Sequence, residues 1–147
     1  MIDNKPFKAE DYVQIYPHAV DETARRMSAE EVYSVGQFHE AGHCGFTGWL
    51  GDTPLGCLGI DTVRPGVGQM WSIINTEVRG HIIESMRATK MMLNIIEEDY
   101  DFKKLRSESR IGFPESQRFL EFLGFTRSRR TIMQGTHFHY TRLTCHH

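Results

Sequence analysis

The chain has 147 residues, of which 39% are hydrophobic and 24% are charged, and its formal net charge is -2. This composition is typical of a soluble globular protein and predicts one domain over residues 1–147. No apolar run approaches the roughly 20 residues of a membrane span. The small net charge gives no general attraction to nucleic acid, and the basic run at 127–130, interpreted as a solvated hairpin, is too short to change that. The three cysteines are irregularly spaced, which argues against a disulfide framework.

The first part of the chain is predicted to be largely helical. Residues 1–6 lack the basic region and apolar core of a secretory signal, so we expect the chain to stay inside the cell. Residues 8–16 are compatible with an edge strand or with the lead into a helix. Residues 21–27 indicate a helix, and Ser28 and Glu31 form a capping box that begins another.

Two hairpins are predicted. The β-type runs at 45–50 and 55–60 flank a turn-rich connector, which indicates the first hairpin. Residues 64–68 are expected to form a loop that leads into the next strand. The runs at 131–133 and 138–141 bracket a short polar connector with a glycine, which indicates the second hairpin.

The stretch from residue 69 to residue 125 organises the chain. Residues 70–74 are a bulky apolar run, which predicts a strand buried on both faces. Residues 81–99 repeat apolar side chains at helical spacing and predict a long amphipathic helix. We expect this helix to cross over to a second strand at 104–109 that lies next to the first strand and parallel to it.

A shorter helix is predicted to follow the second strand. Pro114 suits the first helical turn, and Gly124 suits the left-handed position after the last turn. Phe119, Phe122 and Leu123 are expected to form the buried stripe of this helix.

This order of strands and helices, which ends in the letters FLEFLGF, resembles the GNAT acetyltransferase superfamily. The segments MWSIINTEVRGHIIESMRATKMMLNIIEEDY and SQRFLEFLGF also look like a group of tailed-phage proteins that includes the podovirus internal virion protein A. The resemblance implies an α/β (α+β) fold with a mixed, mainly antiparallel sheet and helices on both faces. It also implies that acetyl-coenzyme A (acetyl-CoA) lies where the parallel strands splay apart.

The resemblance assigns a role to the turn after the central strand. In the family this turn has the form Arg/Gln-x-x-Gly-x-Gly/Ala, because the amides at the helix start must closely approach a pyrophosphate. Here Arg79 and Gly80 match, while Ile82 and Glu84 occupy glycine positions. The resemblance therefore implies acetyl-CoA binding by Arg79, Gly80, His81 and Ile82, with an ordinary helix start as the alternative. Because the glycines are replaced, we expect acetyl-CoA to bind weakly or not at all.

The short helix bears on catalysis. Family members often carry Asn-x-x-Ala-x-x-Phe-Tyr there, and the tyrosine can protonate the departing thiolate. Counting back from Gly124 places Phe119 at the phenylalanine and Leu120 at the tyrosine, so the packing position matches and the chemical one does not. Glu77, at the end of the central strand, is then the candidate general base, and a solvated turn carboxylate is the alternative.

Residues His39 to His43 fit the zinc-protease pattern H-E-x-x-H. In that pattern two histidines one helical turn apart hold zinc, and the glutamate activates the metal-bound water. Gly42 weakens the helix between the histidines and a β-type run follows at once, so we expect no zinc site. The tail at 145–147 could hold a metal adventitiously or be a frayed polar end, and His137 and His139 are interpreted as a solvated pair.

Two functions of different classes follow. The first is a phage protein with a GNAT-like fold and a degenerate acetyl-CoA site, which acts in virion assembly or binds a phage or host protein. The second is an acetyl-CoA-dependent N-acetyltransferase with an unusual phosphate loop. The first function places the chain in the virion or the host cytoplasm. Neither function predicts nucleic-acid binding, a metal or a particular oligomeric state.

Overall fold

A computed structural model describes residues 1–132 and 135–143. The chain divides into two compact units, each described below by itself. Unit 1 is Met1–Asp61 with Trp71–Leu93, and unit 2 is Thr62–Met70 with Asn94–His147. The expectation of a single domain stays a prediction.

The secondary structure follows the expected succession. The strands are β1 (Asp3–Pro6), β2 (Gly45–Leu50), β3 (Thr53–Arg64), β4 (Val67–Ile74), β5 (Lys104–Arg110), β6 (Thr126–Ile132) and β7 (His137–Leu143). The α-helices are α1 (Ala9–Ile15), α2 (Glu22–Arg25), α3 (Ala29–Ala41), α4 (Ile82–Tyr100) and α5 (Pro114–Phe122), and the 3-10 helices are η1 (Tyr16–His18) and η2 (Thr76–Gly80). No helix within the described residues combines the length and the apolar character needed to cross a membrane.

The sheet is mixed and mainly antiparallel, as expected. Its strand order is β1-β2-β3-β4-β5-β7-β6. Neighbouring strands run antiparallel in the pairs β1/β2, β2/β3, β5/β7 and β6/β7, whereas β4 and β5 are parallel. The predicted central strand and its parallel neighbour after the long helix are therefore confirmed.

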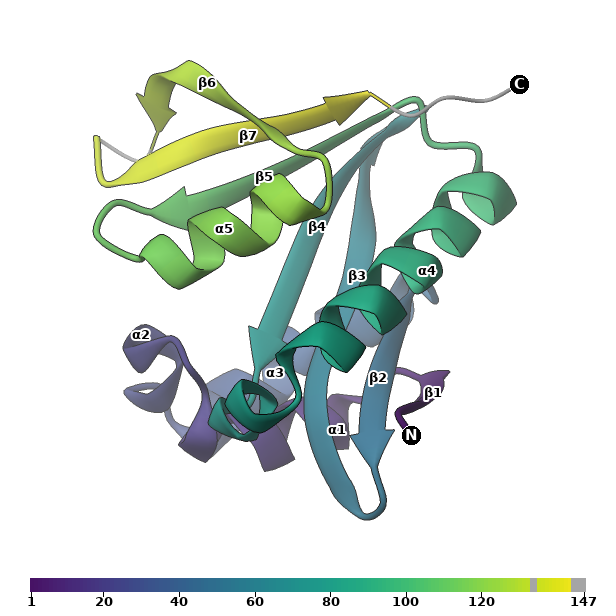
Figure 1. The fold of residues 1–147 in the computed structure, drawn as a ribbon, viewed down its shortest axis with the longest axis vertical. Helices are drawn as coiled ribbons and strands as arrows, with labels where there is room; N and C mark the ends of the chain where they lie inside the picture. The colour runs from purple at the N-terminus through teal and green to yellow at the C-terminus, as the bar shows by residue number, and fades with distance from the viewer. Residues whose placement is uncertain (133–134, 144–147) are drawn as a thin grey trace. The chain divides into compact units, whose positions relative to one another are not determined.

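Unit 1 packs helices against both sides of its strands. Figure 1 shows α1 and α3 on the far side of β2 and β3, and the first part of α4 on the near side. Helices α1 and α3 approach closely where Gly36 faces Ala9, because a Cβ on Gly36 would lie 3.1 Å from the Ala9 Cα. The core on the α1 side is a cluster of buried residues from several elements, namely Phe7, Ile15, Ala19, Cys57 and Ile73.

Local hydrogen bonds fix helix α1, which the sequence left open, and helix α3, which it predicted. Residues 9–15 form α1, where Asp11 accepts a hydrogen bond from the Lys8 amide at 3.1 Å and one from the Thr47 hydroxyl at 2.8 Å. Helix α3 begins with the predicted capping box. The Ser28 hydroxyl accepts from the Glu31 amide at 3.1 Å, and the Glu31 carboxylate accepts from the Ser28 amide at 3.3 Å.

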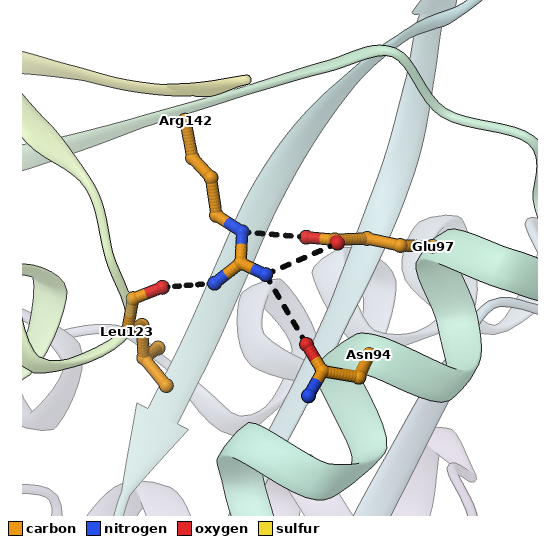
Figure 2. A network of polar contacts seen from close by, with 4 residues as sticks. All are labelled: Asn94, Glu97, Leu123 and Arg142. Atoms are coloured by element: carbon orange, nitrogen blue, oxygen red, sulfur yellow. Dashed lines mark hydrogen bonds and ion pairs between the residues drawn. The ribbon is translucent and has the colours of Figure 1, made fainter. Parts of the chain in front are cut away.

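A partly buried guanidinium connects three elements of unit 2 (Figure 2). The Arg142 Nε on β7 lies 2.8 Å from a carboxylate oxygen of Glu97, and its Nη2 donates to Glu97 and to Asn94 at 3.1 Å each. Nη1 donates to the backbone carbonyl of Leu123, at the end of α5. Figure 2 shows the guanidinium reaching all three residues. One side chain thus joins α4, α5 and β7.

Several sequence expectations need correction. The run at 70–74 is not buried on both faces, because Ser72 is exposed and only Met70 and Ile73 are fully buried. Phe122 is 40% exposed, whereas Leu120 and Leu123 are buried. The helical period explains this, since residues three apart share a face and Phe122 points elsewhere.

One turn differs from expectation. The predicted loop at 64–68 is a tight turn, in which Pro65 and Gly66 join β3 to β4 and Gly66 has a φ of 80°. The basic run at 127–130 lies within β6, a strand of the hairpin with β7, as expected, and the Arg127 guanidinium stacks 4.5 Å from the centroid of the Phe138 ring. Strands β6 and β7 confirm the second hairpin, although residues 133 and 134 lie outside the described chain.

We expect Arg142→Met to destabilise the protein by about 3 kcal/mol, because it leaves the Glu97 carboxylate buried without its cation. The double variant Arg142→Met with Glu97→Met should lose much less, since it removes both charges. Urea unfolding of the single and double variants measures the difference. A double variant as unstable as the sum of the single changes would contradict this account.

Gly59→Ala should destabilise the protein by about 1–3 kcal/mol through overpacking. A Cβ there would lie 2.6 Å from both the Cys44 carbonyl oxygen and a Trp71 ring carbon. Gly80→Ala is the matched control, because a Cβ at Gly80 meets no atom within 4 Å. Thermal unfolding should separate the two variants clearly, and equal melting temperatures would disprove the close packing.

Stability should fall at alkaline pH because of two buried thiols. Burial raises the pKa of Cys57 from 9.0 to about 12 and that of Cys44 from 9.0 to about 11. The folded state therefore holds protons that the unfolded state releases, so this stability is complete below pH 9 and is lost as pH rises toward those values. Cys57→Ala should weaken the decline in unfolding free energy measured between about pH 8 and pH 10.5. An unchanged decline would contradict the assignment.

Candidate functional site

The H-E-x-x-H residues of unit 1 straddle the end of a helix. Helix α3 ends at Ala41, Gly42 caps it, and His43 has a φ of 54°, in the left-handed region. His39 and His43 therefore do not occupy successive turns of one helix, as the zinc-protease pattern requires. The early helix end inferred from sequence is confirmed.

His39 and Asp61 form a closely paired dyad. The His39 Nδ1 lies 2.7 Å from the Asp61 Oδ2, and the two side chains are only 12% and 18% exposed. An ionised carboxylate can only accept a hydrogen bond, so Nδ1 carries the hydrogen and Nε2 has the lone pair in the neutral ring. Within the described chain, Nε2 has no hydrogen-bond partner.

Trp71 of β4 fixes the orientation of the imidazole. The two rings are stacked, with centroids 4.1 Å apart and planes 13° apart. Phe7 and Tyr12 flank the indole at centroid distances of 4.8 and 6.2 Å. Burial raises the pKa of Tyr12 to about 12, so its hydroxyl stays protonated at neutral pH.

Two glycines make room for the indole. A Cβ at Gly45 would lie 2.9 Å from a Trp71 ring carbon, and a Cβ at Gly59 would lie 2.6 Å from the same carbon. This edge of the ring therefore lies against the backbones of β2 and β3. The aromatic stack and the dyad depend on glycine at these positions.

The other motif residues line a small cavity of about 100 Å³ next to the dyad. The Glu40 side chain is held by the start of α1, because its Oε1 accepts a hydrogen bond from the Ala9 amide at 2.8 Å. The cavity is lined by Pro6, Phe7, His39, Glu40, His43, Cys44 and Gly45.

The described residues contain no group of three or more His, Cys, Asp or Glu side chains placed to hold a metal ion. The absence of a catalytic zinc at His39, Glu40 and His43 stays a prediction. The tail at 145–147 lies outside the described chain.

The predicted coenzyme-binding residues gather where β4 leads into α4, also in unit 1. Glu77, Arg79 and Gly80 share the 3-10 helix η2, and His81 follows it. All three of those η2 residues are exposed. Helix α4 has Ile82 as its first residue. The carbonyl of His81 accepts a hydrogen bond from the Ser85 amide at 3.0 Å, so His81 is the N-cap of this helix.

Sequence reasoning missed Asn75, which positions this turn. Asn75 is buried, its Oδ1 accepts from the Glu77 amide at 3.0 Å, and its Nδ2 donates to the Pro54 carbonyl at 3.1 Å. An asparagine directly after a strand is a typical helix N-cap, which was the available signal. The dyad partner Asp61 was also missed, and nothing local in the sequence marks it.

The turn leaves space for a ligand at some positions and presents side chains at others. A Cβ at Gly80 would meet no atom within 4 Å, so the backbone there is open. Ile82 is 50% exposed, and Glu84 is exposed in the first turn of α4. The Glu77 carboxylate is exposed and makes no polar side-chain contact with a described residue.

Comparison with known proteins places the fold. No protein-family model and no curated protein matches the chain. Among solved structures, it is similar to a GNAT-family acetyltransferase from Bacillus anthracis, with 12% identity, a TM-score of 0.73 and coverage of 97% of this chain and 94% of that one. An acetyltransferase from Streptococcus agalactiae matches with 10% identity, a TM-score of 0.76 and coverage of 97% and 98%.

A third similar structure is RimL, a ribosomal L7/L12 alpha-N-protein acetyltransferase in complex with coenzyme A. It has 11% identity, a TM-score of 0.70 and coverage of 97% of this chain and 93% of that chain. Identities this low establish the fold alone. The chain therefore has the fold of the GNAT acetyltransferases.

Proposed function

We propose that this protein is an acetyl-CoA-dependent N-acetyltransferase. The observation that carries the proposal is the match to acetyltransferase structures over nearly the whole length of both chains, including one with coenzyme A bound. Since fold alone does not fix chemistry, the residues of unit 1 must also suit the reaction.

The turn between β4 and α4 suits a pyrophosphate. Arg79 is exposed and supplies a cation, and Gly80 leaves its backbone open to a ligand. The first amides of α4 lack partners within the helix and lie at the positive end of its dipole. We assign pyrophosphate contacts to Arg79, Gly80, His81 and Ile82. When bound, acetyl-CoA supplies the activated acetyl group, and these residues hold and orient it.

Glu84 and Ile82 weaken this site without closing it. Both side chains are exposed, so neither has collapsed onto the turn. The Glu84 carboxylate competes with phosphate for the same helix dipole, which is worth about 0.3–1 kcal/mol to an anion at a helix start. We therefore expect weak coenzyme binding. Glu77 remains the candidate general base of this turn, since its exposed carboxylate can reach a solvent-borne amine.

The second candidate is an assembly or interaction protein of a phage, with the same fold and no acetyl transfer. It would act in the virion or the host cytoplasm and bind a phage or host protein. The observation in its favour is the exposed apolar pair at the start of α4, where Ile82 is 50% and Ile83 is 68% exposed. A coenzyme site does not need two exposed isoleucines at this place.

Acetyl-CoA titration by calorimetry tests the proposal. We expect saturable binding that Arg79→Gln weakens by about tenfold, because a charge-assisted hydrogen bond contributes about 1.5–3 kcal/mol. Glu84→Gln should strengthen binding by about two- to fivefold. Arg87→Gln, on an exposed position further along α4, is the control and should change little.

Acetyl transfer to a primary amine by the unchanged protein would complete the case. Absence of binding at millimolar acetyl-CoA would reject the acetyltransferase and leave the interaction protein. Equal losses in the Arg79 and Arg87 variants would mean that the coenzyme is held by net charge and not at this turn.

A further inference from the structure

The cavity at the end of α3 has a defined chemical character. At about 100 Å³ it has room for roughly three water molecules or for the end of an alkylamine chain. Pro6 and Phe7 supply apolar surface, while His39 and Glu40 supply polar atoms. One Glu40 oxygen accepts a hydrogen bond from the Ala9 amide, and Glu40 is an acidic residue of the lining. Such a site favours a small cation with an apolar stem.

The dyad equips this cavity with a proton acceptor. Asp61 holds the Nδ1 hydrogen of His39, and Trp71 fixes the ring plane by stacking. The tautomer that results has its lone pair on Nε2, which has no partner within the described chain. A carboxylate that orients an imidazole in this way also stabilises the imidazolium that forms when Nε2 takes a proton.

Cys44, which lines the cavity along with His43, does not compete. Its burial raises the pKa of the thiol to about 11, so it is a neutral thiol at physiological pH. A neutral thiol is a poor nucleophile. His39 lines the cavity, and the Nε2 of its imidazole is the proton acceptor that the dyad supplies there.

We propose that the cavity at the end of α3 binds the acceptor as a primary amine and that His39, oriented by Asp61, takes its proton. This inference rests on the proposed acetyltransferase function. The ammonium gives one proton to Nε2, and its nitrogen then forms the C–N bond to the acetyl carbon as the C–S bond breaks. The second proton of that nitrogen ends on the departing thiolate. In this proposal His39, and not Glu77, is the general base and a catalytic residue, and Asp61 is a positioning residue.

A purely structural role for the dyad makes a different prediction. If the pair only tied α3 to β3, any donor to Asp61 would serve. His39→Asn keeps an N–H donor near the Nδ1 position and cannot accept a proton. Asp61→Asn keeps the size of the side chain and can donate to Nδ1, which moves the hydrogen to Nε2 and removes its lone pair.

Acylation of histidines by diethyl pyrocarbonate tests the site without any coenzyme. The full chain is labelled and each histidine is followed by peptide mass spectrometry, with exposed His18 as the internal reference. We expect n-butylamine to protect His39, and n-butanol of similar size to give no protection. Asp61→Asn should slow labelling of His39 by about tenfold and leave His18 unchanged. Absence of amine protection, or an unchanged rate in Asp61→Asn, would overturn the proposal.

Kinetics separate this inference from the acetyltransferase proposal. His39→Asn should lower kcat by about 10²–10⁴-fold with little change in the KM for acetyl-CoA. Unchanged kcat in a folded, active His39→Asn variant would refute the role of His39 while leaving the acetyltransferase intact. If the unchanged protein binds no acetyl-CoA, the proposed function fails, and the labelling experiment still decides whether the cavity holds an amine next to His39.

Discussion

The packing of Trp71 against the glycine backbone of β2 and β3 is the constraint on which the candidate site depends. Gly45 and Gly59 lack the Cβ atoms that would displace the indole, so an edge of the ring lies against the strands while one of its faces stacks on His39. The indole N–H has no hydrogen-bond partner among the described residues, and an unsatisfied buried donor costs about 1–3 kcal/mol. Packing with Phe7, Tyr12 and His39 must exceed that cost. The Trp71 indole carries this cost, and by stacking on His39 it orients the imidazole.

Within the described residues, the Arg142–Glu97 and His39–Asp61 pairs have different consequences. In unit 2 each guanidinium nitrogen of Arg142 has a partner, so the whole guanidinium is engaged in structural contacts. In unit 1 Asp61 engages one nitrogen of His39 and leaves the other with a lone pair next to a cavity. A satisfied network rigidifies a fold, whereas an imidazole that keeps a lone pair can still take a proton. This difference directs attention to His39 and away from Arg142.

Sequence periodicity predicted most of the fold and little of the site. The strands and helices of the central stretch were predicted because their apolar spacing and their turn residues are local signals, as Pro114 and Gly124 show. Burial was less predictable, since Phe122 lies outside the buried face of α5 and is exposed. β1 was missed because its letters, DNKP, are polar and include a proline. The His39–Asp61 pair joins residues 22 positions apart, and only tertiary structure brings them together.

The H-E-x-x-H pattern and the altered phosphate turn both show that the letters of a motif do not determine its geometry. The pattern is complete in letters, but the helix ends at Ala41, so its histidines lose the spacing that gives the pattern its chemistry. The turn lacks the family glycines in letters, yet Gly80 remains open and the substituted side chains project to solvent. A sequence motif depends on the backbone that carries it, because the φ and ψ angles determine the distances between its ligand groups. The backbone at this helix start is therefore open although two family glycines are replaced, while a complete metal motif yields a histidine that is hydrogen-bonded to Asp61.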